Sequence, residues 1–135
     1  MRYIIDTHIF LWLLFDTKRV PTKILNILRD PLNEIYITSI SFWEISLKYN
    51  LGKLELNGVK PEDLPQMATD MGIEVLEISP IEMASFYQLP KVENHKDPFD
   101  RIIIWHSIMH EDIMVSLDRK FEEYKAFGLQ VLSDS

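Results

Sequence analysis

Residues 2–15 have the sequence RYIIDTHIFLWLLF, and this stretch decides the fold class. Its first part is a short apolar run, rich in residues that favour strands, and it ends in the acid Asp6. Its second part has the length and the apolar density of a helix. The sequence therefore predicts a buried strand over residues 2–6 that leads directly into a helix over residues 7–15.

The same alternation of strand and helix continues along the chain. Further strands are predicted at residues 34–38, 73–78, 113–118 and 129–132, and helices at residues 21–30, 41–51, 61–71, 80–89, 101–111 and 119–127. Apolar strands separated by helices form parallel sheets that are covered on both faces. We therefore expect an α/β fold, a three-layer α/β/α sandwich with a central, mostly parallel sheet, in a single domain over residues 1–135.

The composition is that of an ordinary globular protein, with 135 residues of which 47% are hydrophobic. The chain has no cysteine, so disulfides and thiolate chemistry are excluded, and any metal must be held by oxygen or imidazole. The apolar run at residues 9–15 lacks a signal cleavage site and is too short to span a membrane. We therefore expect a cytoplasmic protein.

The formal net charge of −7 argues against a protein that holds nucleic acid on a broad basic face. This argument weakens if several acids share one site with bound metal. Contact with phosphates would then depend on bases close to the acids in sequence, namely Lys48, Lys96, Arg101, Arg119 and Lys120.

Four acids stand near junctions between predicted strands and helices. Asp6 and Asp118 each close a strand. Glu44 lies in the first turn of the helix after the second strand, and Asp100 in the first turn of the helix that leads towards Asp118. Ligands of parallel sheets bind beyond the carboxyl ends of the strands, where Mg²⁺ would relieve the repulsion between grouped carboxylates. Such a site activates water for attack on phosphorus, so phosphodiester hydrolysis is the predicted reaction class.

Each acid also has a purely structural explanation. Glu44 completes an S-x-x-E capping box that begins at residue 41, a pattern that recurs at residues 79–82. Asp97 is placed as the N-cap of the helix that contains Asp100, and Asp100 would favour the helix dipole. Asp6 and Asp118 could cap the helices that follow them, although an acid that closes a buried strand needs donors or a cation.

His106 and His110 are four residues apart, as are the two histidines of zinc-binding helices. The H-E-x-x-H pattern of zinc proteases requires glutamate at position 107, where this chain has Ser107. We therefore expect these histidines to be core or surface residues.

Four blocks of the sequence resemble the PIN domain family and, within it, the VapC-like toxins of bacterial and archaeal toxin–antitoxin modules. They are IIDTH at residues 4–8, SFWEIS at residues 41–46 with Lys48 and LGKL at residues 51–54, HKDPFDRIII at residues 95–104, and VSLD at residues 115–118. The blocks occur in the order and at the spacing of the family, so the resemblance covers essentially the whole chain.

The resemblance implies a Mg²⁺- or Mn²⁺-dependent endoribonuclease, with RNA as the substrate and a quartet of acids at Asp6, Glu44, Asp100 and Asp118. It makes Asp97 an additional acid near the metal. It implies that Thr7 and Ser116 orient the acids or the waters of the metal. It leaves open whether Arg101 pairs with a carboxylate or contacts a phosphate.

The resemblance also implies partners, namely a second copy in a homodimer and a cognate antitoxin protein that keeps the toxin inactive. Two other functions stay open from the residues alone. One is a protein-binding module that keeps the fold without cleaving RNA, although such a module would be expected to lack some of the acids. The other is a phosphatase or DNA nuclease that uses the same carboxylates.

Overall fold

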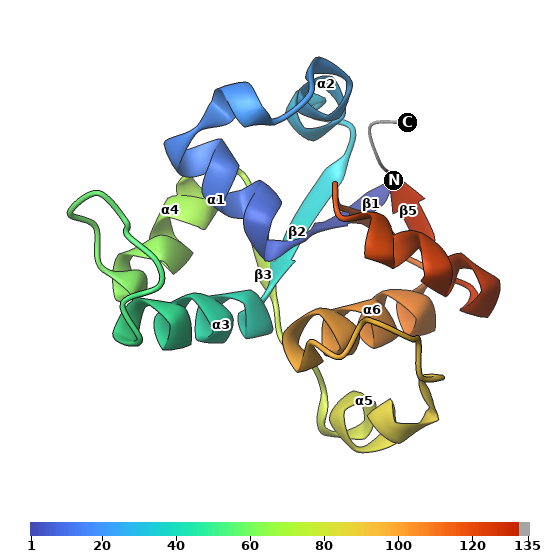
Figure 1. The fold of residues 1–135 in the computed structure, drawn as a ribbon. Helices are drawn as coiled ribbons and strands as arrows, with labels where there is room; N and C mark the ends of the chain where they lie inside the picture. Colours follow the sequence, from blue (N-terminus) through green and yellow to red (C-terminus); the bar gives the residue numbers. More distant parts are fainter. Residues whose placement is uncertain (133–135) are drawn as a thin grey trace.

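The computed structural model describes residues 1–132, in which five parallel strands form one sheet between helices (Figure 1). The strand order is β3-β2-β1-β4-β5. The strands are β1 (Arg2–Ile5), β2 (Glu34–Thr38), β3 (Glu74–Leu76), β4 (Ile113–Val115) and β5 (Gln130–Leu132). The predicted α/β/α sandwich is confirmed, while residues 133–135 of the predicted domain lie outside the described residues.

The helices connect the strands in the predicted order. They are α1 (Thr7–Phe15), α2 (Thr22–Arg29), α3 (Ser39–Asn50), α4 (Leu64–Asp70), α5 (Pro80–Ser85) and α6 (Pro98–His110). In the described part of the chain, four 3₁₀ segments accompany them: η1 (Thr17–Arg19), η2 (Pro61–Asp63), η3 (Phe86–Gln88) and η4 (Arg119–Phe127). None of the helices in residues 1–132 is long and apolar enough to cross a membrane.

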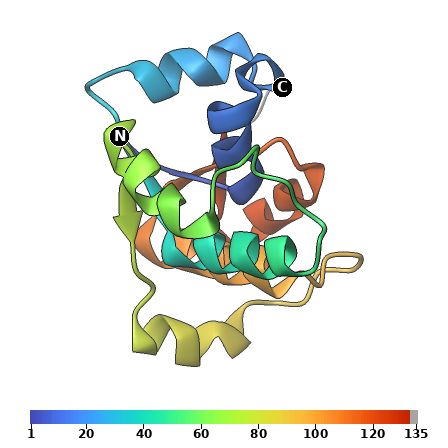
Figure 2. The same ribbon diagram turned by 90° about the vertical axis from the view of Figure 1, so that its left-hand side faces the viewer.

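Successive strand residues point to opposite faces of the sheet and build two separate cores. On one face, Ile5 and Val115 belong to a cluster that includes residues of α1, α2 and α4. On the other face, Ile4 and Met114 belong to a cluster that includes residues of α6 and η4. Figures 1 and 2 show α1 and α2 (blue) on the opposite side of the sheet from α5 and α6 (yellow and orange).

The strands that follow β1 in sequence are added first on one side of it and then on the other. The chain adds β2 and β3 on one side of β1, and then returns through α5 and α6 to place β4 and β5 on the other side. The carboxyl ends of β1 and β4 therefore lie next to each other at a topological switch point, where ligands of open α/β sheets bind.

The predicted capping box at residues 41–44 is wrong, whereas the one at residues 79–82 is confirmed. Helix α3 already begins at Ser39, directly after β2, so Ser41 lies within its first turn. Both Ser41 and Glu44 are buried there and turn towards α1. Glu44 is therefore not a capping residue, and helix capping does not explain the presence of this acid.

Other elements differ from the prediction in their bounds or in their type. The strands predicted at residues 73–78 and 113–118 are shorter, at Glu74–Leu76 and Ile113–Val115. Asp118 consequently follows a short connection after β4 rather than ending the strand. The segment predicted as a helix at residues 119–127 is the 3₁₀ segment η4.

Candidate active site

Asp6 leaves the carboxyl end of β1 and caps α1. Its Oδ1 accepts a hydrogen bond from the backbone N–H of Ile9 at 2.8 Å, and the residue is 3% exposed. Burial raises the pKa of Asp6, and the charge of Asp118 acts in the same direction. The hydroxyl of Ser116 and the N–H of Ile9 oppose this rise without cancelling it. A buried acid beside a second acid is therefore built into the end of β1.

Asp118 reaches the same edge of the sheet from β4. The buried Ser116 hydroxyl accepts a hydrogen bond from the Asp118 backbone N–H at 3.0 Å. Oδ1 of Asp118 accepts from the backbone N–H of Lys120 at 2.9 Å and so caps η4. Ser116 thus contacts both acids, since its side chain also hydrogen-bonds to Asp6.

Glu44 lies in the second turn of α3 and is 1% exposed, and both its carboxylate oxygens have partners. Oε1 accepts from the hydroxyl of Thr7 at 2.7 Å. Oε2 lies 2.5 Å from Nζ of Lys48, one turn further along the helix. The Thr7 hydroxyl also lies 2.9 Å from Oγ of Ser41, so one residue of α1 holds two residues of α3.

Asp97 and Asp100 stand at the N-terminus of α6. Asp97 is the N-cap, as predicted, and its Oδ1 accepts from the backbone N–H groups of Phe99 at 2.9 Å and Asp100 at 3.4 Å. This cap is compatible with a second role near a metal, because the other carboxylate oxygen has no hydrogen bond within residues 1–132.

Asp100 is the residue on which the charges of the other acids act. Its pKa is raised to about 8, first by burial and then by the negative charges of four other acids, namely Asp97, Glu44, Asp6 and Asp118. The charges of these carboxylates therefore act on Asp100 together. The four predicted acids and Asp97 form one electrostatically coupled group, although they come from different segments of the chain.

A buried chain of polar groups supports Asp100 from behind. Nε2 of His95 lies 3.4 Å from Oδ2 of Asp100, and Nδ1 of His95 lies 2.7 Å from the hydroxyl of Tyr124. Nη1 of Arg101 donates to that hydroxyl at 3.0 Å. His95 and Tyr124 were not among the predicted site residues. His95 lies in a recognised block, whereas nothing in the sequence connects Tyr124 to it.

The guanidinium of Arg101 is occupied by the protein itself. Besides Tyr124, it donates to the backbone carbonyls of Leu89 and Pro90, at 3.3 Å and 3.2 Å. Of the bases expected near the site, Lys48 is paired with Glu44, while the remaining three are exposed: Lys96, Arg119 and Lys120.

A family model of the PIN domain matches residues 3–126. The chain therefore belongs to the PIN domain family, a family of nucleases, and the resemblance stated from the sequence is confirmed. No curated protein matches the chain.

Solved structures share this fold. VapBC2 from Rickettsia felis, solved with a DNA fragment from its promoter, is 20% identical, with a TM-score of 0.64 over 98% of this chain and 98% of that chain. VapBC-1 from nontypeable Haemophilus influenzae is 17% identical, with a TM-score of 0.69 and the same coverage of both chains. The PIN domain endonuclease Utp24 is 18% identical, with a TM-score of 0.55 over 99% of this chain and 85% of that chain. At these identities the similarity shows the fold.

Proposed function

We propose that residues 1–135 form one nuclease domain, a Mg²⁺- or Mn²⁺-dependent endoribonuclease that is the toxin of a type II toxin–antitoxin system. The observation that carries the proposal is the position of Asp6 and Asp118 after the neighbouring strands β1 and β4, with Asp100 near enough for burial and the charges of these acids to raise its pKa to about 8. Carboxylates grouped at this cost are typical of sites that bind a hard cation. Membership of the PIN family supports the nuclease activity.

The residues at this site fit Mg²⁺ or Mn²⁺, because carboxylate oxygens are the ligands that these ions prefer. We assign Asp6, Asp100 and Asp118 to the metal, directly or through water, with Asp97 as an additional acid. Glu44 binds the metal or orients the attacking water. When bound, the ion lowers the pKa of water and stabilises negative charge on phosphate oxygens.

The supporting residues fix the orientation of these acids. Thr7 holds Oε1 of Glu44, and Ser116 hydrogen-bonds to Asp6 while accepting from the backbone of Asp118. Asp100, whose pKa is raised to about 8, would hold a proton near neutral pH without a metal and would have to release it to act as a ligand. Arg101 acts through Tyr124 and the loop carbonyls that it binds.

RNA cleavage by the wild type and by Asp6→Asn tests the proposal, with Mg²⁺, with Mn²⁺ and with EDTA. We expect cleavage by the wild type with either metal, and no cleavage with EDTA or by Asp6→Asn. Asp70→Asn, a change of an exposed acid on α4, is the matched control and should remain active. Equal cleavage in every condition would contradict the proposal.

The same assay separates the other two functions. Faster cleavage of single-stranded DNA, or hydrolysis of a phosphomonoester, would indicate a DNA nuclease or a phosphatase at the same carboxylates. Absence of Mn²⁺ binding in calorimetry, together with absence of cleavage, would favour a protein-binding module.

For substrate contact we assign the exposed bases Lys96, Arg119 and Lys120, which lie beside the acid blocks in sequence.

For the antitoxin we assign the apolar pocket of about 250 Å³ that includes Ile40, Met83 and Trp43, whose side chain packs on Phe99. Trp43 is 61% exposed, and the pocket includes Phe99, which directly precedes Asp100, so a partner seated there would lie near the N-terminus of α6. Light scattering with and without a co-expressed antitoxin would test both this complex and the expected homodimer.

A further inference from the structure

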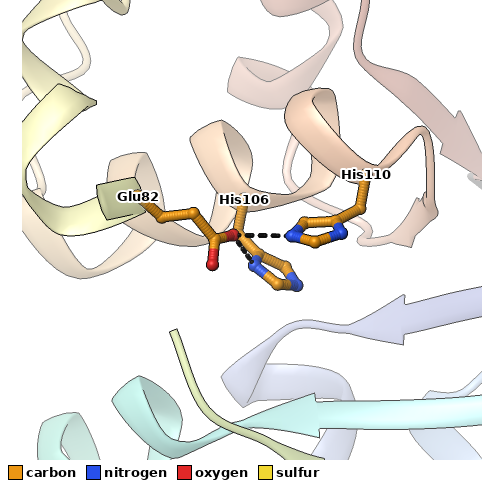
Figure 3. A group of neighbouring side chains, drawn as sticks. All are labelled: Glu82, His106 and His110. Carbon is orange, nitrogen blue, oxygen red and sulfur yellow. Dashed lines mark hydrogen bonds and ion pairs between the residues drawn. The ribbon is translucent and has the colours of Figure 1, made fainter. Parts of the chain in front are cut away.

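A group of side chains of the types that bind metals lies on α5 and α6, apart from the acids around Asp100. Glu82 projects from α5 towards His106 and His110, which lie one turn apart on α6 (Figure 3). Oε1 of Glu82 contacts Nδ1 of His106 and lies 2.9 Å from Nε2 of His110. Each residue offers one ligand atom, and these atoms all lie within 4.8 Å of one another, the one such group of three in the described residues.

This group is separate from the carboxylates of the proposed nuclease site. Asp100 belongs to the first turn of α6, whereas His106 and His110 belong to its second half. At about 1.5 Å per residue, the two histidines lie about 9 Å and about 15 Å beyond Asp100 along the helix. The histidine pair, which the sequence suggested was a core or surface feature, is therefore not part of the acid cluster.

The carboxylate of Glu82 is held in place before any ion arrives. Its Oε2 accepts a hydrogen bond from the backbone N–H of Ser79 at 2.9 Å, and its own N–H donates to Oγ of Ser79 at 3.2 Å. The capping box thus uses one carboxylate oxygen and directs the other towards the two imidazoles. Ligands that are fixed by such outer contacts bind metal more tightly than free side chains.

The buried carboxylate of Glu82 favours a positive ion at this point. Glu82 is 5% exposed and His106 is 3% exposed, whereas the side chain of His110 is 47% exposed. The buried carboxylate therefore lies beside a histidine that is open to solvent, which gives an ion a route of entry.

We propose that Glu82, His106 and His110 form a second metal site, which binds one Zn²⁺ ion and ties α5 to α6. Two imidazoles with one carboxylate are a ligand set of zinc proteins, and three protein ligands leave the fourth tetrahedral position to water. The set contrasts with the oxygen-only carboxylates near Asp100, which suit Mg²⁺ or Mn²⁺. The site does not depend on the proposed nuclease activity.

One feature limits the affinity of this site. Nε2 of His106 is buried and has no hydrogen-bond partner in the described residues. When Nδ1 binds the metal, the ring proton resides on Nε2, and an unpaired buried N–H group weakens binding. We therefore expect a dissociation constant on the order of micromolar, weaker than that of closed structural zinc sites.

Titration of the purified protein with Zn²⁺, in excess Mg²⁺ to occupy the acid cluster, tests the site. We expect one Zn²⁺ per chain and a rise in melting temperature of about 5–10 °C at saturation. Co²⁺ in place of Zn²⁺ should give the visible absorption of a tetrahedral site, which hydrogen bonding alone would not produce.

The decisive variants are His110→Ala and Glu82→Gln. His110 is exposed, so its loss should leave the fold intact, and the amide introduced by Glu82→Gln would keep an oxygen for the Ser79 N–H. Both should weaken Zn²⁺ binding at least about tenfold, because each removes one of three ligands. His8→Ala, which removes an exposed histidine elsewhere, is the matched control and should bind Zn²⁺ as the wild type does.

Two results would overturn the proposal. One is Zn²⁺ binding that is equal in the wild type, His110→Ala and Glu82→Gln. The other is Zn²⁺ binding that is lost in Asp6→Asn but kept in His110→Ala, which would place the ion among the carboxylates at the end of β1. RNA cleavage is not needed to read either result, so failure of this site and failure of the nuclease proposal are distinguishable.

Discussion

Nζ of Lys48 lies 2.5 Å from Oε2 of Glu44. Lys48 thus supplies a positive charge to a buried carboxylate of the acid cluster. Partial burial acts to lower the pKa of Lys48, but the hydrogen bond and charge of Glu44, together with the charges of Asp97 and Asp100, outweigh it and raise this pKa. Lys48 therefore partly compensates the acids before a metal binds.

Lys48→Met should destabilise the metal-free protein, because it leaves Glu44 charged and buried without its counterion. Breaking a fully buried pair costs about 3–5 kcal/mol, but the side chain of Lys48 is 38% exposed, so we expect about 1–2 kcal/mol. Urea unfolding in EDTA measures the loss. Lys53→Met, at an exposed lysine nearby, is the control, and an equal loss in both variants would contradict the assigned role.

Asp100 should make the stability of the metal-free protein depend on pH. Its folded pKa of about 8 lies above the ordinary value of 3.8, so the folded state binds a proton that the unfolded state has released. Stability is therefore lost as the pH rises from about 4 to about 8. Asp100→Asn should remove this loss. Near neutral pH its free energy of unfolding should exceed that of the wild type by about 2 kcal/mol or more, because one pKa unit corresponds to about 1.4 kcal/mol.

Urea unfolding in EDTA at about pH 5 and about pH 8 measures this difference. Asp70→Asn, at an exposed acid, should follow the wild type at both values. Parallel pH profiles for the wild type and Asp100→Asn would show that Asp100 ionises as an ordinary surface acid does.

Thr7→Val should impair the metal site through Glu44, because it removes the hydroxyl that donates to Oε1. We expect metal affinity or cleavage rate to fall about 10- to 100-fold, the usual effect of losing a group that orients a ligand. The fall should appear in Mn²⁺ calorimetry and in kcat more than in KM. Thr7→Ser keeps the hydroxyl and should restore both; a serine variant as poor as the valine variant would indicate a packing defect.

Much of the fold could be predicted because apolar spacing records which side chains are buried. The helix at residues 7–15 and the strand at residues 34–38 were predicted with the bounds that α1 and β2 have. The same spacing does not distinguish an α-helix from a 3₁₀ segment, because both can bury one stripe of residues, and η4 was therefore predicted as a helix.

The candidate site shows where local patterns fail. Residues 41–44 satisfy a capping pattern, but β2 leads straight into α3, so the helix begins before Ser41. One partner of Glu44 is Thr7, which lies 37 residues away and is brought close only by the packing of α1 on α3. His95 and Tyr124 are likewise 29 residues apart, so no spacing rule connects them.

The buried polar chain behind Asp100 predicts one protonation state for His95. Burial raises the pKa of Tyr124 against the opposing charge of Arg101, so its hydroxyl keeps a proton, which it donates to Nδ1 of His95 while accepting from Arg101. Burial also lowers the pKa of His95, so the ring is neutral and its proton resides on Nε2, facing Asp100.

Tyr124→Phe should therefore change His95 as well as stability. Removing the hydroxyl leaves Nδ1 of His95 and one Arg101 donor without this partner, which should cost about 1–3 kcal/mol in urea unfolding. Nitrogen NMR of the imidazole should show the Nε2–H tautomer in the wild type and a mixture in the variant, and Mn²⁺ affinity should fall because Asp100 loses its fixed donor. Tyr87→Phe, at a tyrosine that is 81% exposed, should change none of these. An unchanged tautomer in Tyr124→Phe would mean that Asp100 alone determines the proton position on His95.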